Sequence, residues 1–237
     1  MADRFYCADL TGSNASLDSA EAHHALHVMR VKIGQQVTLF DGVGTTAVAT
    51  VHTTNRREVC CDIVNKSFTE RRREGAVTIL AVPPKGERLK WLVEKLTEVG
   101  VDRFIPLRCE RAVVDPRQSK LEKLPATVIS AAKQCGRSWL MEIGDPVELS
   151  EFLNATPPDS TRILMAHPAT KPVLPSQTSP DRETSILIGP EGGFTEAELL
   201  LAEQNGANLV AWPGPILRTE TAAVAFATMA LACQPGR

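Results

Sequence analysis

The stretch that most constrains this chain is LIGPEGGFTEAE, residues 187–198, in which a short apolar segment runs into a glycine-rich turn and then into a helix signal. Gly189, Gly192 and Gly193 allow backbone angles and close approaches that a side chain would forbid. Thr195 and Glu198 form a helix-capping pair, so a helix begins here with its first amides pointing outward. A strand, a glycine turn and a helix start together predict a ligand site of an α/β protein; the alternative is a tight connection that holds no ligand.

Two common nucleotide-binding patterns do not fit this stretch. It lacks the Lys-Ser/Thr pair of a phosphate-cradling loop, and it does not match the dinucleotide fingerprint. The GxGxxA match GVGTTA at 42–47 is followed by strand-like sequence where a helix is required. The glycine turn therefore predicts a different kind of ligand.

The pattern of predicted secondary structure changes near residue 72, which predicts two domains within the 237 residues. Before that point, short segments with β-branched and alternating character are separated by turns, as in a small barrel, and one helical piece at 17–29 interrupts them. After it, strands alternate with helices, which is typical of a mostly parallel sheet covered by helices. We predict a barrel domain at 1–72 and an α/β domain at 73–237.

The α/β part contains a series of recognisable elements. Apolar positions at helical spacing predict a helix that stops at Gly100, a natural residue just past a helix end. The predicted strands are 77–83, 103–107, 162–167 and 185–190, and further helices are expected at 118–134, after Thr195, and at 219–233. A Pro/Ser/Thr-rich loop is predicted from 167 to 185.

A second cluster, WPGPILRTETAAVAFATMALA, begins at Trp212. A turn built on Pro213, Gly214 and Pro215 leads into an alanine-rich helix from Thr219. Arg218 stands directly before that helix start, where the helix dipole favours anions rather than cations. This position predicts either an external anion or substrate beside Arg218, or a surface salt bridge.

Net charge, cysteine spacing and the length of apolar runs limit the classes of protein to which this chain can belong. The net charge of −2 gives no global basic field, so nucleic-acid binding has to come from local patches. Six cysteines without CxxC spacing indicate reduced thiols, and no run approaches the roughly 18 apolar residues of a membrane helix. We expect a cytoplasmic protein without a metal: His23 and His27 lie one helical turn apart, but no third ligand is placed to complete a site. The run Arg71-Arg72-Arg73 is interpreted as a solvated linker, with contact to RNA as the alternative.

Four motifs in this order and spacing carry a family resemblance: KGERLKWLVEKLTEVGV, AAKQCGR, LIGPEGGFTEAE and ILRTETA. Together with RFYC and HHALHVMRVKIGQQVTLFDG near the start, they resemble the RsmE-type uridine-N3 methyltransferases of 16S ribosomal RNA, members of the SPOUT superfamily. The resemblance covers nearly the whole chain. It implies a PUA-like β-barrel, then a SPOUT α/β domain tied in a trefoil knot, S-adenosyl-L-methionine as methyl donor, ribosomal RNA or the small subunit as partner, and a homodimer.

The chemistry of uridine methylation, taken with this resemblance, suggests roles for individual residues, and Arg4, Arg30 and Arg137 also match the family pattern. Arg218 is expected to stabilise negative charge that develops on the uracil, and Glu220 either orients Arg218 or caps the helix. Donor binding is expected from backbone groups and apolar contacts of the two loops, with His167 at a neighbouring strand end. The donor-binding set is His167, Gly189, Pro190, Glu191, Gly192, Gly193, Pro213, Gly214, Ile216 and Leu217. The RNA-binding set is Arg4, Arg30, Lys32, Lys85, Arg88 and Arg137.

One residue and one short stretch depart from the family pattern. Lys133 stands where a glutamate is usual, and WPGPILR (212–218) replaces the usual LGxRILR. These changes leave the glycine turn intact but concern the edge of the donor pocket and the RNA contact near Lys133. Two alternatives to the leading hypothesis remain open: methylation of another RNA by the same fold, and a non-catalytic RNA-binding factor in ribosome assembly.

Overall fold

The computed structural model describes residues 3–55, 58–71, 75–113, 121–157, 159–168 and 182–233. The chain divides into two compact units, each with its own contacts. Unit 1 comprises Met1–Arg71 and Ile129–Leu140, and unit 2 comprises Arg72–Val128 and Met141–Arg237. Unit 1 thus includes a segment from well beyond residue 72, which the change of sequence texture did not indicate.

Unit 1 is built on a five-stranded sheet in the order β1-β3-β4-β5-β2. Its strands are β1 (Arg4–Tyr6), β2 (Asn14–Ser16), β3 (Gln36–Phe40), β4 (Thr45–Thr54) and β5 (Val59–Phe68). Strand β1 pairs in parallel with β3, and the other pairs are antiparallel, with two register shifts between β4 and β5. Such shifts bend strands, which suits a curled sheet around an apolar core.

The predicted helical piece at 17–29 is two different helical segments. Asp18 caps α1 (Ser19–His23) by accepting hydrogen bonds from two backbone amides of its first turn. The helix then widens into a π-helical segment, η1 (His24–Met29). This segment ends at Arg30, which has the left-handed conformation with φ 55°. Arg30 is the one non-glycine residue of the described chain with positive φ. Apolar spacing predicts a helix but does not distinguish the two hydrogen-bonding patterns.

A largely buried ion pair holds the segment Ile129–Leu140 in unit 1. Lys133 Nζ lies 2.6 Å from Glu21 Oε1, and both side chains are at most 14% exposed. Glu21 also accepts a hydrogen bond from the Tyr6 amide. The lysine that departs from the family pattern is therefore the partner of a buried glutamate.

Unit 2 is built on a seven-stranded sheet in which every pairing is parallel. The order is β12-β10-β11-β6-β7-β8, and β9 also pairs with β7. The strands are β6 (Val77–Ala81), β7 (Arg103–Arg108), β8 (Glu142–Ile143), β9 (Val147–Glu148), β10 (Thr161–Ala166), β11 (Glu183–Ile188) and β12 (Asn208–Val210). Parallel pairing brings the carboxyl ends of β10, β11 and β12 to one edge.

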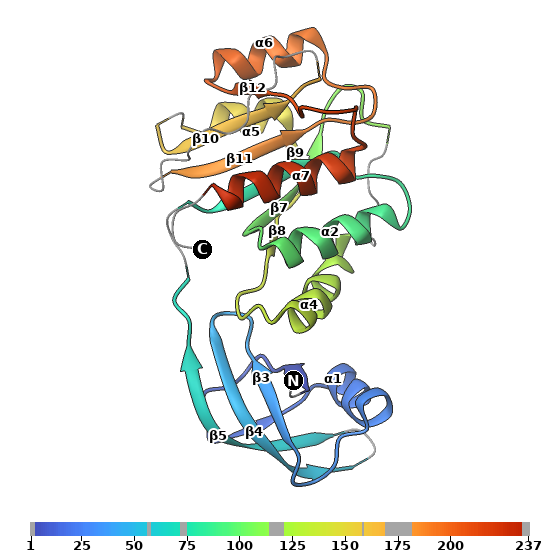
Figure 1. Cartoon of the computed structure of the whole chain (residues 1–237), viewed down its shortest axis with the longest axis vertical. Helices are drawn as coiled ribbons and strands as arrows, with labels where there is room; N and C mark the ends of the chain where they lie inside the picture. Colours follow the sequence, from blue (N-terminus) through green and yellow to red (C-terminus); the bar gives the residue numbers. More distant parts are fainter. Residues whose placement is uncertain are drawn as a thin grey trace. The chain divides into compact units, whose positions relative to one another are not determined.

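Helices cover both faces of this sheet (Figure 1). Alternate residues of the strands, including Leu80, Ile105 and Leu187, form a core with α5 (Leu149–Ala155) and α6 (Glu196–Gln204). On the opposite face, α7 (Thr219–Ala232) packs against β6, β11 and α2 (Arg88–Val99). After the edge strand β12 the chain thus turns back, and α7 packs against the middle strands of the sheet.

The long predicted elements agree with the structure. Gly100 ends α2 in the left-handed conformation, with φ 98°, and α4 spans Leu124–Cys135. Residues 118–120 of the predicted helix and most of the predicted 167–185 loop lie outside the described residues. Strands β1, β2, β8, β9 and β12 were not predicted, because two or three residues show no period. Helix α5 was not predicted either, because its seven residues make only about two helical turns.

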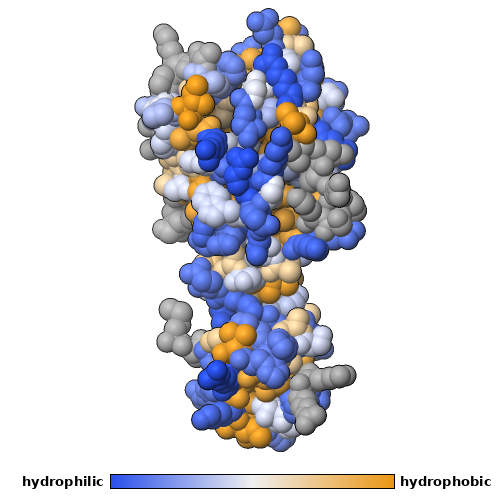
Figure 2. Space-filling model, turned by 90° about the vertical axis from the view of Figure 1, so that its right-hand side faces the viewer, coloured by the Kyte–Doolittle hydropathy of each residue, from blue (hydrophilic) through white to orange (hydrophobic). Residues whose placement is uncertain are grey.

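The described surface mixes hydrophilic and hydrophobic residues on the face drawn in Figure 2, as is usual for folded domains. All six cysteines are free thiols. None of the described helices is long and apolar enough to cross a membrane.

Candidate functional site

A cavity of about 320 Å³ lies in unit 2 at the edge where β10, β11 and β12 end. His167, Gly189 and Ala211 each follow directly after one of these strands and line the cavity. Because the three strands are parallel, residues far apart in the sequence meet here. The volume lies within the range of small-molecule sites, and the carboxyl edge of a parallel sheet is where α/β proteins bind ligands.

One wall of the cavity is the glycine turn between β11 and α6. The amide of Gly193 donates to the carbonyl of Pro190 at 2.9 Å, which closes a turn around Glu191 and Gly192. Gly193 then adopts φ 68°, a left-handed conformation that favours glycine. The predicted capping box is present, with Thr195 and Glu198 each bonded to the other's backbone amide. The turn is thus held in one shape from both ends.

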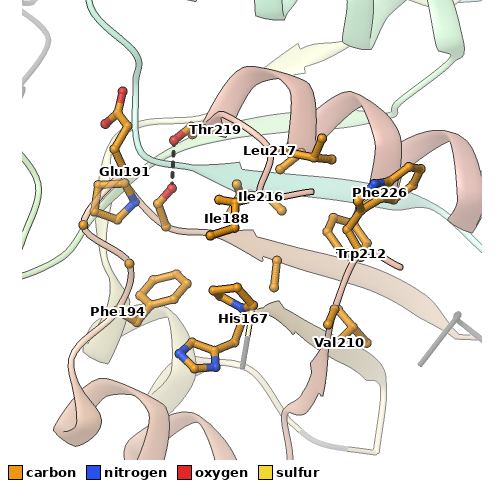
Figure 3. Close-up of a pocket in the computed structure, with 18 of the residues that line it drawn as sticks. His167, Ile188, Glu191, Phe194, Val210, Trp212, Ile216, Leu217, Thr219 and Phe226 are labelled. Carbon is orange, nitrogen blue, oxygen red and sulfur yellow. Dashed lines mark hydrogen bonds between the residues drawn. The ribbon is translucent and has the colours of Figure 1, made fainter. Parts of the chain in front are cut away.

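The opposite wall is the loop 211–218 between β12 and α7. Gly214 lies so close to the ring of Trp212 that a Cβ atom would stand 2.8 Å from the indole nitrogen. Ile216 is 86% exposed although it lines the cavity. Figure 3 shows Ile216 and Leu217 on one side of the cavity and Phe194 and His167 on the other. Apolar side chains therefore enclose a space rimmed by backbone groups.

One hydrogen bond joins the two walls. The hydroxyl of Thr219, the first residue of α7, donates to the carbonyl of Gly189 at 3.0 Å (Figure 3). The glycine turn and the 211–218 loop are therefore adjacent, although some thirty residues separate these partners. Thr219 was predicted only as the start of a helix, and this contact was not predicted.

The two residues predicted to act in catalysis occupy different environments. Arg218 is exposed at the N-cap position of α7, between the lining residues Leu217 and Thr219, and makes no side-chain cap. Glu220 is buried and accepts a hydrogen bond from Arg88 Nη1 at 3.4 Å. Arg88 Nη1 also lies 3.8 Å from Glu191 Oε1. Glu220 thus contacts Arg88, whereas its expected partner was Arg218 or the helix backbone.

Arg111 also contacts the glycine turn, as Arg88 does, and no sequence motif predicted this role. Its Nη1 donates to the carbonyls of Gly192 at 2.9 Å and Phe194 at 3.4 Å. Beside it, the Glu110 amide donates to Glu198 Oε1 at 2.8 Å. The segment after β7 therefore supports the glycine turn from outside the local sequence.

The structure brings nearly all of the predicted donor-binding set together. Nine of those residues line the cavity: His167, Gly189, Pro190, Glu191, Gly192, Gly193, Gly214, Ile216 and Leu217. Pro213 is the exception. Lining residues that were not in the predicted set include Arg111, Phe194, Val210, Trp212, Thr219 and Phe226. Of the apolar members, Phe194 directly follows the glycine turn, Val210 ends β12, Trp212 lies just after it, and Phe226 comes from α7.

The residues predicted to contact RNA belong to both units. In unit 1, Arg4 Nη2 donates to the Arg137 carbonyl at 3.0 Å, and the Arg4 guanidinium stacks 4.5 Å above the Phe40 ring. Burial lowers the pKa of Arg4. Arg30 and Lys32 are exposed in the same unit. In unit 2, Lys85 is exposed, and Arg88 contacts the two glutamates described above.

Among the described residues, no group of three or more His, Cys, Asp or Glu side chains could hold a metal ion. The rings of His23 and His27 lie 4.5 Å apart and tilted.

The fold and cavity match a known class of enzyme domain. Residues 71–231 match the model of an RNA methyltransferase domain, and residues 17–64 match that of an RNA methyltransferase PUA domain. The expected fold class, a SPOUT α/β methyltransferase domain preceded by a PUA-like barrel, is thereby confirmed.

Individual relatives show which RNA methyltransferases this chain is similar to. Ribosomal RNA small subunit methyltransferase E of Bacillus subtilis (strain 168) is 30% identical over 219 residues, which cover 87% of this chain and 85% of that protein. The enzyme of the same name from Neisseria gonorrhoeae, solved with bound S-adenosyl methionine, has a TM-score of 0.88 at 27% identity and covers 99% and 98% of the two chains. A Legionella pneumophila methyltransferase with bound S-adenosylmethionine has a TM-score of 0.86 at 27% identity, covering 99% and 98%. This chain belongs to the RNA methyltransferase family that includes ribosomal RNA small subunit methyltransferase E.

Proposed function

We propose that this protein transfers a methyl group from S-adenosyl-L-methionine to ring nitrogen 3 of a uridine in small-subunit ribosomal RNA. The observation that carries the proposal is the cavity formed by the glycine turn and the 211–218 loop at the carboxyl edge of the sheet. Relatives that match nearly the whole chain bear the name of small-subunit ribosomal RNA methyltransferases, and two solved relatives hold the donor.

The lining of the cavity fits this donor. An adenosine with a thioether chain needs apolar surfaces and backbone hydrogen-bonding groups more than charges. Phe194, Ile216 and Leu217 supply apolar surface, and the glycine turn presents backbone with little side-chain cover. The bound donor would supply a methyl group on a sulfonium, activated for in-line displacement. The residues of this chain would hold it in line with the acceptor nitrogen.

Arg218 is the residue that we assign to the reaction itself. It stands at the start of α7 beside two lining residues, with its side chain exposed. Loss of the imide proton leaves negative charge on the uracil oxygens, and a nearby guanidinium would stabilise that charge. Glu220 acts indirectly in this proposal, because its carboxylate contacts Arg88 and so positions the start of α7.

RNA binding is assigned to local basic residues in both units. Arg30 and Lys32 of unit 1 and Lys85 of unit 2 are exposed and available for phosphate contacts. Arg4, Arg88 and Arg137 stay in the proposed RNA-binding set, although contacts within their own units already engage Arg4 and Arg88. We further propose a homodimer that works in the cytoplasm, where ribosomal subunits are available to it.

The test is nucleoside mass spectrometry of 16S ribosomal RNA from cells with and without the gene. Loss of one N3-methyluridine, restored by the wild-type gene, is the expected result. An unchanged RNA, combined with no binding of S-adenosylhomocysteine by calorimetry, would favour the non-catalytic assembly factor. A methyl group missing from another RNA would favour the other-substrate alternative.

A further inference from the structure

Arg111 has a defined place at the rim of the cavity. It lies three residues beyond the end of β7 and is among the lining residues. Both of its bonds to the carbonyls of Gly192 and Phe194 come from the same nitrogen, Nη1. Two carbonyls at the glycine turn therefore fix the position of the guanidinium.

The rest of that guanidinium is suited to an anion. A guanidinium carries five N–H donors in a planar fork, and Nη1 holds only two of them. No partner among the described residues bonds to Nε or Nη2, and their donors have the geometry that pairs with both oxygens of a carboxylate. Because Nη1 is already held in place, little side-chain freedom would be lost when a ligand binds.

The charges of the lining point to the same ligand group. Among the described residues that line the cavity, Arg111 is the one arginine or lysine, and Glu191 is the one carboxylate. Figure 3 shows the Glu191 carboxylate pointing away from the other labelled side chains, and Arg88 Nη1 lies 3.8 Å from it. An anionic ligand group at this rim therefore faces Arg111.

We propose that Arg111 binds the carboxylate of the amino-acid end of the methyl donor. This inference rests on the proposed function, because it assumes that the adenosine and thioether occupy the apolar part of the cavity. The amino-acid end is then left for the rim, and its carboxylate is the only anionic group of S-adenosylmethionine. Arg111 would distinguish the complete donor from adenosine thioethers that lack this group.

The experiment compares two ligands that differ only in the carboxylate. S-adenosylhomocysteine and its decarboxylated analogue, S-adenosyl-3-thiopropylamine, are titrated calorimetrically into the wild-type protein and into Arg111→Gln. The wild type should prefer S-adenosylhomocysteine by about 10- to 100-fold, the value of a charge-assisted hydrogen bond converted to affinity. In Arg111→Gln this preference should fall to near one.

The pair of ligands separates a carboxylate contact from mere support of the turn. If Arg111 only supports the glycine turn, Arg111→Gln weakens both ligands equally and the wild-type preference survives, which overturns the proposal. Unchanged affinities for both ligands with a raised KM for RNA would overturn it too, in favour of a phosphate contact. A wild-type protein that binds neither ligand would instead refute the proposed function.

Two further variants make the result independent of folding defects. Arg103→Gln changes an exposed arginine at the opposite end of β7 and should keep the wild-type preference. Arg111→Lys keeps the charge but loses the fork, so it should retain a reduced preference for S-adenosylhomocysteine. If the preference in Arg111→Lys is as low as in Arg111→Gln while both melt like the wild type, the contact depends on the guanidinium fork and not on charge alone.

Discussion

Gly189 and Gly193 have different reasons to be glycine although they lie in one turn, and Gly192 between them has neither constraint. A Cβ at Gly189 would stand 3.1 Å from the Phe194 ring, and Gly193 has φ 68°. A Cβ at Gly192 would make only ordinary contact with Arg111, at 3.6 Å. Backbone conformation at Gly193 and space at Gly189 are thus the constraints, and a small side chain fits at Gly192.

Gly193→Ala should weaken S-adenosylhomocysteine binding roughly 10-fold, because a left-handed conformation costs a residue with a Cβ about 1–2 kcal/mol. Gly192→Ala is the matched control and should bind almost as the wild type does. Calorimetric titration measures both. Equal losses in the two variants would show that the backbone angle at Gly193 is not the constraint.

Arg218→Ala should reduce the methylation rate at saturating substrates by about 100-fold or more, the usual effect of removing one stabilising donor from a developing anion. Donor affinity should stay within a few-fold of wild type, because Arg218 does not line the cavity. Single-turnover assays with small subunits lacking the methyl group give the rate, and titration gives the affinity. An undiminished rate would remove Arg218 from the reaction.

The thiols should differ in reactivity with pH. Burial, with the nearby Glu198 carboxylate as a smaller cause, raises the pKa of Cys109 to about 11. At pH 8 only about one Cys109 in a thousand is then a thiolate, and the fraction rises with pH toward 11. Iodoacetamide at pH 8 should label the exposed Cys135 and Cys233 well before Cys109, as read by peptide mass spectrometry. Early labelling of Cys109 would contradict its burial.

At the scale of elements, the start of α6 bonds both to its own backbone and to the segment after β7. Glu198 completes the capping box with one carboxylate oxygen and accepts the Glu110 amide with the other. The helix start, the glycine turn before it and the segment after β7 are thereby joined. A local capping signal in the sequence thus also stabilises a tertiary contact at the cavity.

Glu198→Ala should lower the free energy of unfolding by about 1–2 kcal/mol, the range for loss of a helix cap. Glu196→Ala changes an exposed acidic residue of the same helical turn and should cost well under half of that. Urea unfolding followed by circular dichroism gives both values. If the two variants unfold alike, the cap contributes only through the charge of the first turn.

At the scale of the whole molecule, the chain does not divide at a single point. Residues Ile129–Leu140 belong to the same compact unit as the barrel. They do so although strands β6 and β7 and helix α2 of unit 2 come before them in the sequence. The Lys133–Glu21 pair and the bond from Arg4 to the Arg137 carbonyl hold this segment. Lys133 is thus explained by Glu21, whose carboxylate it neutralises.

Lys133→Met should destabilise unit 1 by about 3–5 kcal/mol, because it leaves the buried Glu21 carboxylate without its counterion. Lys123→Met changes an exposed lysine nearby in the sequence and should be close to neutral. The double variant Glu21→Gln with Lys133→Met should recover part of the loss. Urea unfolding measures all three, and a neutral Lys133→Met would show that water already solvates Glu21.

The sequence by itself determined the local features: the glycine turn, the cap of α6, the helix that ends at Gly100, and the change from barrel-like to α/β texture. These depend on residues within a few positions of one another, whose spacing is visible in one dimension. The family resemblance added the fold class and most of the donor-binding set. Only the tertiary structure decided that Thr219 meets Gly189, that Arg111 meets Gly192 and that Arg88 meets Glu220. These partners lie 30, 81 and 132 residues apart, and parallel strand pairing, which no local pattern encodes, brings them to one edge of the sheet.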